Sequence, residues 1–217
     1  MSEFELYSYP RCPYSQRVQI TLLEKNIEFK KTDVKLAPAE DWFLAISPYG
    51  EVPVLKAGNA YVPQSTAINE FLEDIAPQIP LLPADPVKRA EARLWITSCD
   101  GQLMPACHAL IRDRRDEEKQ KANRGRLDIQ LIRLSKAIEK SGGPYWLGSE
   151  FSLVDATFAP FLERYDCYIE VWRARWPDEA SALREWWDVV RERKSVAATL
   201  HDREYHLEVY RGYDAAP

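Results

Sequence analysis

The sequence predicts a small α/β domain at the N-terminus and an all-α domain at the C-terminus. Within residues 1–76, short runs rich in aromatic and β-branched residues alternate with segments whose apolar residues recur at helical spacing. Residues 77–86 contain four prolines and carry neither pattern, which is typical of a linker. Every periodic segment in residues 87–217 has helical spacing. We therefore expect two domains joined by a proline-rich connection.

The first half of the N-terminal domain has the order strand, helix, strand. The apolar and aromatic run at residues 4–8 predicts a strand. A helix is expected from about Pro13, because proline suits the first helical position. Asn26 tolerates the left-handed conformation that ends many helices. Residues 27–34 then begin with alternating apolar and charged side chains, as in a strand. This order is a βαβ unit.

The second half of this domain predicts a hairpin and a helix. Residues 52–57 and 60–62 flank Gly58-Asn59, a dipeptide that favours a tight turn between strands. A short helix is expected at 42–45, in the preceding loop. Ser65 is expected to cap the next helix. The apolar residues of that helix fall at i, i+3, i+4 and i+7, and they are Ile68, Phe71, Leu72 and Ile75.

The C-terminal domain contains clear amphipathic helices. Ser152 and Asp155 have the spacing of a helix-capping box. Pro105 lies inside a long helical stretch and is expected to kink or divide it. Two apolar stripes predict core-facing helices, one formed by Leu127, Leu131, Leu134 and Ile138 and one by Leu183, Trp186, Trp187 and Val190.

Composition and charge exclude several classes of protein. The 217 residues are 46% apolar and 29% charged, as in ordinary soluble globular proteins. The formal net charge of −5 disfavours nucleic-acid binding, which usually requires a basic excess. The first residues lack the basic and then apolar run of a signal peptide, and no apolar run is long enough to span a membrane. We therefore expect a cytoplasmic protein without a membrane partner.

The four cysteines are expected to be free thiols. Their irregular spacing matches neither a disulfide framework nor a metal site, and no nucleotide-binding motif is present. Cys99, Cys107 and Cys167 lie in helical stretches and are predicted to be small buried apolar side chains. Cys12 instead lies where a strand turns into a helix. Unpaired N–H groups and the helix dipole favour an anion there, so Cys12 is predicted to be a thiolate nucleophile.

Two further features are expected to lie near this thiol. Val52-Pro53 precedes a strand whose start would face the same helix tip. If the peptide bond is cis, the backbone groups of Val52 turn outward and can pair with an extended peptide. Gln64-Ser65 opens the next helix and offers a hydroxyl and a helix N-terminus to a carboxylate. Together these features predict a receptor for a small thiol tripeptide.

With these motifs the chain resembles the glutathione transferase family, most closely its cysteine-bearing, omega-like branch. The resemblance extends over nearly the full length and implies a thioredoxin-like, glutathione-binding domain at 1–76. It further implies a helical-bundle domain at 87–217 with a second-substrate pocket, and a homodimer. The motifs that carry it are residues 12–18, 47–55, 64–68, 152–155, 161–164 and 207–210.

The resemblance also implies roles for individual residues. The position of Cys12 forms a mixed disulfide with glutathione, Val52 pairs with the cysteinyl backbone, and Gln64 and Ser65 hold the γ-glutamyl end. The expected glutathione-binding residues are Pro13, Tyr14, Lys35, Val52, Pro53, Gln64 and Ser65.

This chain departs from the omega-like pattern at two positions. Gln64 replaces a glutamate that would accompany the ammonium group of the ligand, and Asp100, from a second subunit, is the candidate substitute. Ala39 replaces a lysine, and Lys35 is the candidate partner for the glycyl carboxylate. Affinity for glutathione is therefore less directly implied than the chemistry of Cys12.

The second-substrate pocket is expected in the C-terminal domain. His108 and Arg112 lie one helical turn apart on the helix that borders this pocket in the family. Tyr165 and Trp172 are further candidates, with core packing as the alternative for aromatic residues of this kind. The mixed-charge run at 112–119 is expected to be a solvated connection rather than a binding patch.

Ser15 stands where a dithiol enzyme has a second cysteine, so the expected reaction is a monothiol cycle. We expect thiol transferase or dehydroascorbate-reductase-type activity, with glutathione and a small electrophilic or disulfide substrate. Two alternatives remain. One is a non-catalytic, RNA polymerase-binding protein similar to stringent starvation protein A, which residues 152–155 and the linker also resemble. The other is a glutathione-dependent lyase or dehalogenase. Cys12, Val52-Pro53 and Gln64-Ser65 favour the transferase.

Overall fold

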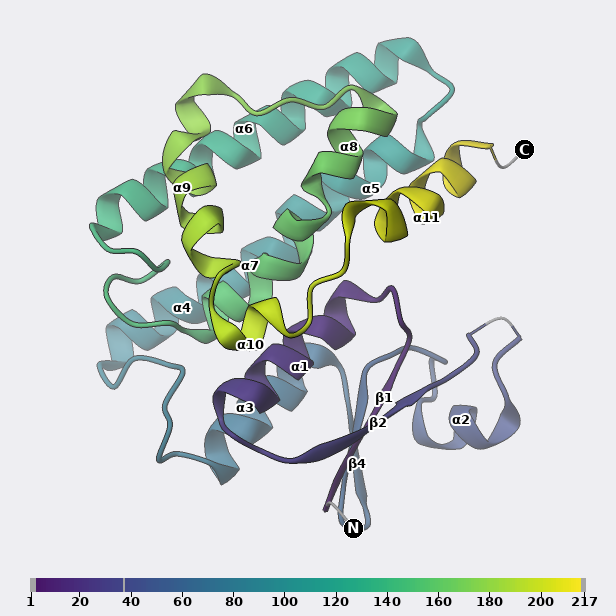
Figure 1. The fold of residues 1–217 in the computed structure, drawn as a ribbon, viewed down its shortest axis with the longest axis vertical. Coiled ribbons are helices and arrows are strands. Elements are labelled where there is room, and N and C mark those ends of the chain that lie inside the picture. Colours follow the sequence, from purple (N-terminus) through teal and green to yellow (C-terminus); the bar gives the residue numbers. More distant parts are fainter. Residues whose placement is uncertain (1–2, 37, 216–217) are drawn as a thin grey trace. The chain divides into compact units, whose positions relative to one another are not determined.

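The computed structural model describes the backbone of residues 3–36 and 38–215. The chain divides into two compact units, Met1–Leu82 and Pro83–Pro217. The first unit is built from a sheet and short helices, and the second is built from helices (Figure 1). The boundary between them lies inside the proline-rich segment 77–86.

The first unit contains a four-stranded mixed sheet in the order β2-β1-β3-β4. Strands β1 and β2 are parallel, as a βαβ crossover requires, and the other pairs are antiparallel. The elements of this unit are β1 (Phe4–Ser8), α1 (Pro13–Glu24), β2 (Phe29–Asp33), α2 (Asp41–Ile46), β3 (Val54–Ala57), β4 (Ala60–Pro63) and α3 (Ser65–Ile75).

The pairing of β1 with β3 determines which loops meet. Tyr7 of β1 lies opposite Val54 of β3, and the two strands run in opposite directions. The loop that leaves β1 and the loop that enters β3 therefore lie at the same edge of the sheet. Cys12 belongs to the first loop, and Val52-Pro53 belongs to the second.

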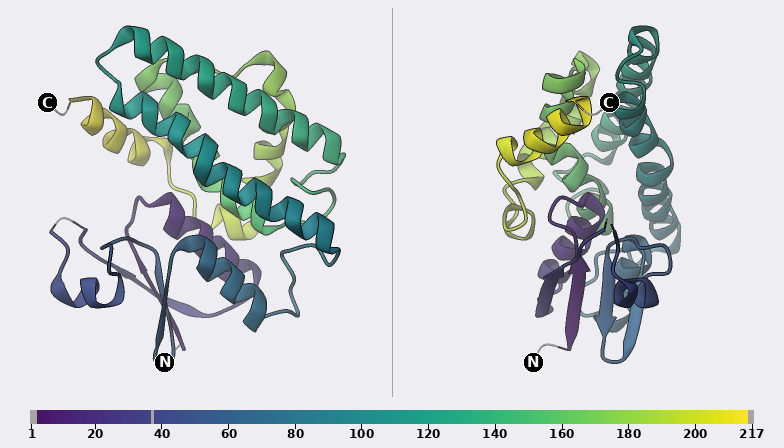
Figure 2. Two further views of the ribbon diagram at one scale, coloured as in Figure 1. Left: turned by 180° about the vertical axis from the view of Figure 1, so that it is seen from behind. Right: turned by 90° about the vertical axis from the view of Figure 1, so that its right-hand side faces the viewer.

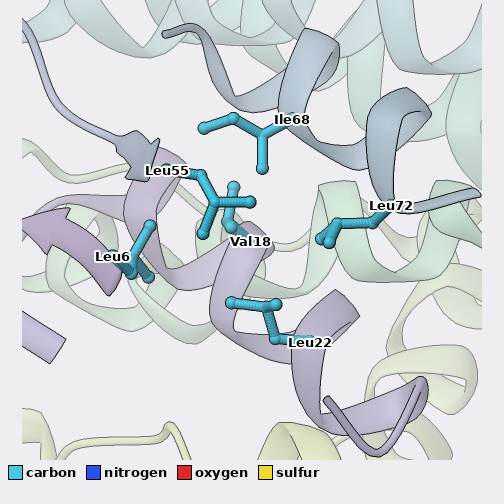
Figure 3. Close-up of a cluster of buried hydrophobic side chains, with 6 residues drawn as sticks. All are labelled: Leu6, Val18, Leu22, Leu55, Ile68 and Leu72. Carbon is cyan, nitrogen blue, oxygen red and sulfur yellow. The ribbon is translucent and has the colours of Figure 1, made fainter. Parts of the chain in front are cut away.

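Helices cover both faces of this sheet. Consecutive strand residues point to opposite faces, so Leu6 and Tyr7 serve different cores. On one face, α1 and α3 pack against the sheet through six fully buried side chains (Figure 3), which are Leu6, Val18, Leu22, Leu55, Ile68 and Leu72. On the other face, Phe43 of α2 packs with Tyr7 and Val54. Each such buried side chain contributes about 1.5–3 kcal/mol by leaving water.

The second strand begins later than the alternating pattern predicts. β2 starts at Phe29, whereas the pattern begins at Ile27. Asn26 adopts the left-handed conformation expected for it, with φ 54°. The N–H group of Ile27 then donates a bond of 2.9 Å back to the carbonyl of Leu22. This bond belongs to the end of α1, so strand pairing starts two residues further on.

A buried lysine at the end of α1 contacts the end of α3 and the segment that follows α3. The side chain of Lys25 is fully buried, and its Nζ donates to the carbonyls of Ala76 (3.1 Å) and Ile79 (2.8 Å). The same atom lies 2.5 Å from a carboxylate oxygen of Glu73. Glu73 in turn accepts from the backbone N–H groups of residues 81 and 82. One ion pair therefore holds the chain where it leaves α3.

The second unit contains helices throughout its described length. Figure 2 shows α4 and α5 almost in line, with α6 packed beside α5. The elements are α4 (Pro86–Ser98), the π-helical turn η1 (Cys99–Leu103), α5 (Met104–Arg112), α6 (Glu117–Ser141), α7 (Leu153–Glu163), α8 (Tyr165–Trp172), the 3₁₀ turn η2 (Asp178–Ala180), α9 (Ser181–Val190), α10 (Lys194–Ala197) and α11 (Arg203–Ala215).

Pro105 lies in the first turn of α5, directly after η1. Proline has no N–H group, and its ring crowds the preceding turn, so a regular helix cannot pass through it. The wider turn η1 separates α4 from α5 at this point, as the position of this proline predicts.

The start of α7 is a buried capping box. Asp155 is fully buried and accepts hydrogen bonds from the Ser152 N–H (2.9 Å) and hydroxyl (2.8 Å), the Trp146 N–H (2.8 Å) and the Trp186 indole (2.7 Å). Burial raises the pKa of this carboxyl group, and these bonds act in the opposite direction. One side chain therefore connects the loop before α7 to α9.

Replacing Asp155 with alanine should reduce the free energy of unfolding by about 3 kcal/mol or more, because four buried donors lose their acceptor. Urea denaturation followed by circular dichroism measures this loss. Asp188→Ala is the matched control, since Asp188 is an exposed carboxylate on α9. A loss in D155A no larger than in D188A would contradict this role.

Candidate active site

Cys12 lies at the beginning of α1. Its backbone is extended (φ −85°, ψ 114°), and it occupies the N-cap position directly before Pro13. A hydrogen bond from the Cys12 N–H to the Tyr9 carbonyl (3.0 Å) closes the turn after β1, and the Cys12 carbonyl accepts the first helical bond from Gln16 (3.1 Å). The side chain makes no capping hydrogen bond and is partly exposed. The sulfur is therefore accessible at the positive end of a helix.

The Val52-Pro53 peptide lies next to this thiol. The bond is cis, as the strand-addition hypothesis requires. The Cys12 Sγ atom is 3.8 Å from the Val52 carbonyl oxygen. Strand pairing of β3 starts only at Val54, so Val52 is outside the β1–β3 and β3–β4 ladders. A thiol and a strand-like peptide group therefore share one edge of the sheet.

The N-terminus of α3 differs from the expected cap. Gln64, and not Ser65, occupies the N-cap position, and Ser65 is the first helical residue. The Ser65 hydroxyl instead accepts a hydrogen bond of 3.3 Å from the guanidinium of Arg17, which is fully buried on α1. Since Oγ acts as an acceptor here, its own O–H remains able to donate to a ligand. A buried cation and a helix N-terminus together favour a bound carboxylate.

The other predicted contacts in this unit are less closely grouped. Tyr14, in the first turn of α1, is half-buried, and its ring centre lies 5.0 Å from the guanidinium carbon of Arg17. Lys35 is exposed between β2 and α2 and makes no hydrogen bond or ion pair with the described residues. The structure therefore joins Cys12 to Val52 and Arg17 to Ser65, and it gives Lys35 no contact with either pair.

The predicted residues of the helical unit fall into two groups. His108 and Arg112 are exposed on α5, and Arg112 forms a two-point hydrogen bond with Asp113, with both distances 3.0 Å. Tyr165 and Trp172 on α8 are each 3% exposed. The Tyr165 hydroxyl donates to a backbone carbonyl at 2.6 Å, and the Trp172 ring packs edge-on against Tyr210 of α11. These two aromatic side chains have the surroundings of core residues.

Three residues of this site were not among the predicted ones. Arg17 lies one turn after Tyr14, and a charged side chain next to the apolar stripe of α1 was the available signal. Ser47 bonds both backbone polar groups of Glu51, and Glu51 accepts a hydrogen bond from the side chain of Gln64. The only sequence signal for Ser47 and Glu51 was their position within the segment that ends at Val52-Pro53.

The described residues contain neither a metal cluster nor a membrane span. No group of three or more His, Cys, Asp or Glu side chains among them is arranged to hold a metal ion. In the same part of the chain, no helix combines the length and apolar character needed to cross a membrane.

Comparison with known proteins agrees with this geometry. The family model described as "Glutathione S-transferase, N-terminal domain" matches residues 6–80, and "Glutathione S-transferase, C-terminal domain" matches residues 118–188. Glutathione S-transferase omega-2 of Rattus norvegicus is 28% identical over 205 residues, covering 93% of this chain and 80% of the relative. The chloroplastic glutathione S-transferase DHAR3 of Arabidopsis thaliana is 30% identical, covering 89% and 70%.

The solved structures include a similar omega-class enzyme. The crystal structure of glutathione transferase Omega 3C from Trametes versicolor matches with a TM-score of 0.88 and 32% identity, covering 98% of this chain and 91% of that one. With this match and both domain matches, the thioredoxin-like and helical units together have the glutathione transferase architecture. The chain belongs to the glutathione S-transferase family, with omega-class enzymes among its relatives.

Proposed function

We propose that this glutathione transferase is a thiol transferase of the dehydroascorbate-reductase type, in which Cys12 reacts through a monothiol mixed-disulfide cycle. The observation that carries the proposal is the position of an accessible sulfur at the N-terminus of α1, 3.8 Å from the Val52 carbonyl oxygen. The Cys12 side chain lies at the positive end of the α1 helix dipole. The omega-class and DHAR3 relatives support a glutathione-dependent transferase activity.

Glutathione would bind in an extended form across the edge of the sheet. Val52 is outside the ladder and can exchange backbone hydrogen bonds with the cysteinyl residue of the ligand. The free O–H of Ser65, the α3 N-terminus and the nearby Arg17 would receive the γ-glutamyl carboxylate. Pro13, Tyr14 and Lys35 are proposed to border the same ligand.

The reaction would proceed by two exchanges at sulfur. In the first, the Cys12 thiolate attacks the glutathionyl sulfur of a mixed disulfide, and the substrate leaves as a thiolate that takes a proton from water. In the second, the thiolate of a free glutathione attacks the sulfur of the bound glutathione. Oxidised glutathione forms, and the Cys12 thiolate is restored. Each cycle consumes one free glutathione, and the other half of the oxidised glutathione is the glutathionyl group of the substrate.

The remaining thiols are poorly suited to resolve the mixed disulfide. Ser15 stands one helical turn after Cys12 and carries a hydroxyl in place of a second thiol. Cys99 is fully buried, and Cys107 and Cys167 are nearly so. Burial raises the pKa of Cys107 to about 12 and that of Cys167 to about 11. A second molecule of glutathione is therefore the expected resolving thiol.

The other expectations for this enzyme extend the proposal. We place the second-substrate pocket in the helical unit, with the exposed His108 and Arg112 of α5 as its best candidates. Tyr165 and Trp172 are buried, so a change of either would act on this pocket through packing. A homodimer in the cytoplasm, as is typical of such enzymes, completes the proposal.

Replacing Cys12 with serine should abolish thiol transfer, because a hydroxyl cannot form the mixed disulfide. The assay measures reduction of the mixed disulfide between glutathione and 2-mercaptoethanol, and mass spectrometry of the wild type should find a glutathionyl group on Cys12. Binding of glutathione should persist in C12S, with weak conjugation of aromatic electrophiles. Cys107→Ala removes a different thiol and is the matched control. Wild-type rates in C12S would refute the mechanism.

Alkylation should discriminate among the four thiols. At pH 8, a thiol with a pKa of about 12, such as Cys107, is ionised in about one molecule in ten thousand. Iodoacetamide should therefore modify Cys12 first in the native protein, and all four cysteines should react after denaturation in urea. Peptide mapping by mass spectrometry follows each site. Modification of Cys107 or Cys167 at the rate of Cys12 would contradict the assignment.

A further inference from the structure

The carboxylate of Glu51 lies beside the proposed glutathione site and has a neutral partner. The Gln64 Nε2 atom donates a hydrogen bond of 2.9 Å to Glu51 Oε2. Among the described residues, the Glu51 side chain makes no ion pair and no other hydrogen bond. An anionic group held in place by an amide, with no cation of its own, is suited to bind a cationic ligand group.

The backbone of Glu51 is held by a single buried side chain. The Ser47 hydroxyl donates to the Glu51 carbonyl at 2.8 Å and accepts from the Glu51 N–H at 3.0 Å. Ser47 is 2% exposed, at the end of α2. Both polar backbone groups of Glu51 are therefore satisfied by one hydroxyl. These two bonds fix the backbone of Glu51, and so they also fix the direction of its side chain. Glu51 directly precedes Val52 in the sequence.

Gln64 has an uncommon backbone conformation. Its φ of 71° lies in the left-handed region, which residues with long side chains rarely occupy. Residues in conformations of this kind cluster at ligand-binding sites. Gln64 holds it at the N-cap of α3, without capping the helix by its side chain. The side chain amide is committed to Glu51 instead.

The Glu51–Gln64 pair offers acceptors for a cationic group, namely the Glu51 carboxylate and the Gln64 amide oxygen. Because Nε2 of Gln64 faces the carboxylate, the amide oxygen is directed elsewhere and remains able to accept. Ser65, the next residue, is suited to an anionic group, because its O–H can donate and it lies beside the buried cation of Arg17. Adjacent residues at the start of α3 thus provide one place for a cation and one for an anion. An α-amino acid group carries both charges on one carbon.

We infer that Glu51, positioned by Ser47 and Gln64, binds the α-ammonium group of the γ-glutamyl residue. It would supply the negative charge that the glutamine at position 64 cannot. This inference rests on the proposed glutathione site at Cys12. Its consequence is selectivity: the enzyme prefers thiol peptides with a free α-amino group. Because Glu51 belongs to the same chain as the rest of the site, Asp100 of a second subunit is not needed as the partner of the ammonium group.

The test compares two thiols in the wild type and in Glu51→Gln. One is glutathione, and the other is glutaryl-cysteinyl-glycine, which lacks only the α-amino group. At pH 7 the wild type should bind glutathione about fivefold more tightly than the analogue, a factor typical of an exposed ion pair. E51Q should bind both alike, and kcat should stay unchanged because the lost contact is equal in the ground and transition states. The neutral glutamine keeps the size of the original side chain and one oxygen that can still accept from Gln64.

A matched variant separates local from general charge effects. Glu28→Gln removes another exposed carboxylate of the same unit and should keep the wild-type preference. If E51Q discriminates between the two thiols as strongly as the wild type, Glu51 is not the ammonium partner, and the role of Cys12 stands. The same conclusion follows if the wild type binds both thiols equally. If the wild type binds neither thiol, the proposed glutathione site itself is wrong.

Discussion

The antiparallel pairing of β1 with β3 is the constraint on which the site depends. It brings the end of one strand and the beginning of the other to one edge of the sheet, although Cys12 and Val52 are 40 residues apart in sequence. The hydrophobic faces of α1 and α3 keep these strands in register, because a shift of one residue would exchange Leu6 with Tyr7 between the two cores. The placement of Cys12 next to Val52 therefore depends on the packing of α1 and α3 against the sheet.

Two opposite charges of the N-terminal unit, on Arg17 and Glu51, lie near this edge of the sheet. Arg17 is a fully buried cation below the start of α3, and Glu51 is an exposed anion on the loop before β3. Each is oriented by a polar side chain of the site, Ser65 or Gln64. In the proposed site, a ligand that carries both charges would meet these two partners in a fixed order, and this would set its direction of binding.

Local patterns in the sequence predicted most of the fold and the position of Cys12 at the start of α1. Pro13 and Asn26 bound a helix, and the residues on either side alternate as strands, so the βαβ unit and the place of Cys12 followed directly. The partners of Ser65 could not be predicted in this way, because Arg17 reaches it from 48 positions away. Aromatic residues such as Tyr165 suit a pocket and a core equally, and only the packing of α8 distinguishes the two.

The buried ammonium of Lys25 also has a mechanical consequence. It donates hydrogen bonds to the carbonyls of Ala76 and Ile79 and forms an ion pair with Glu73. Glu73 in turn accepts hydrogen bonds from the N–H groups of residues 81 and 82. A force on the chain at Leu82 would therefore reach the ends of α1 and α3 through this contact. One ion pair therefore anchors the segment that leaves α3 to the two helices whose N-termini border the proposed site.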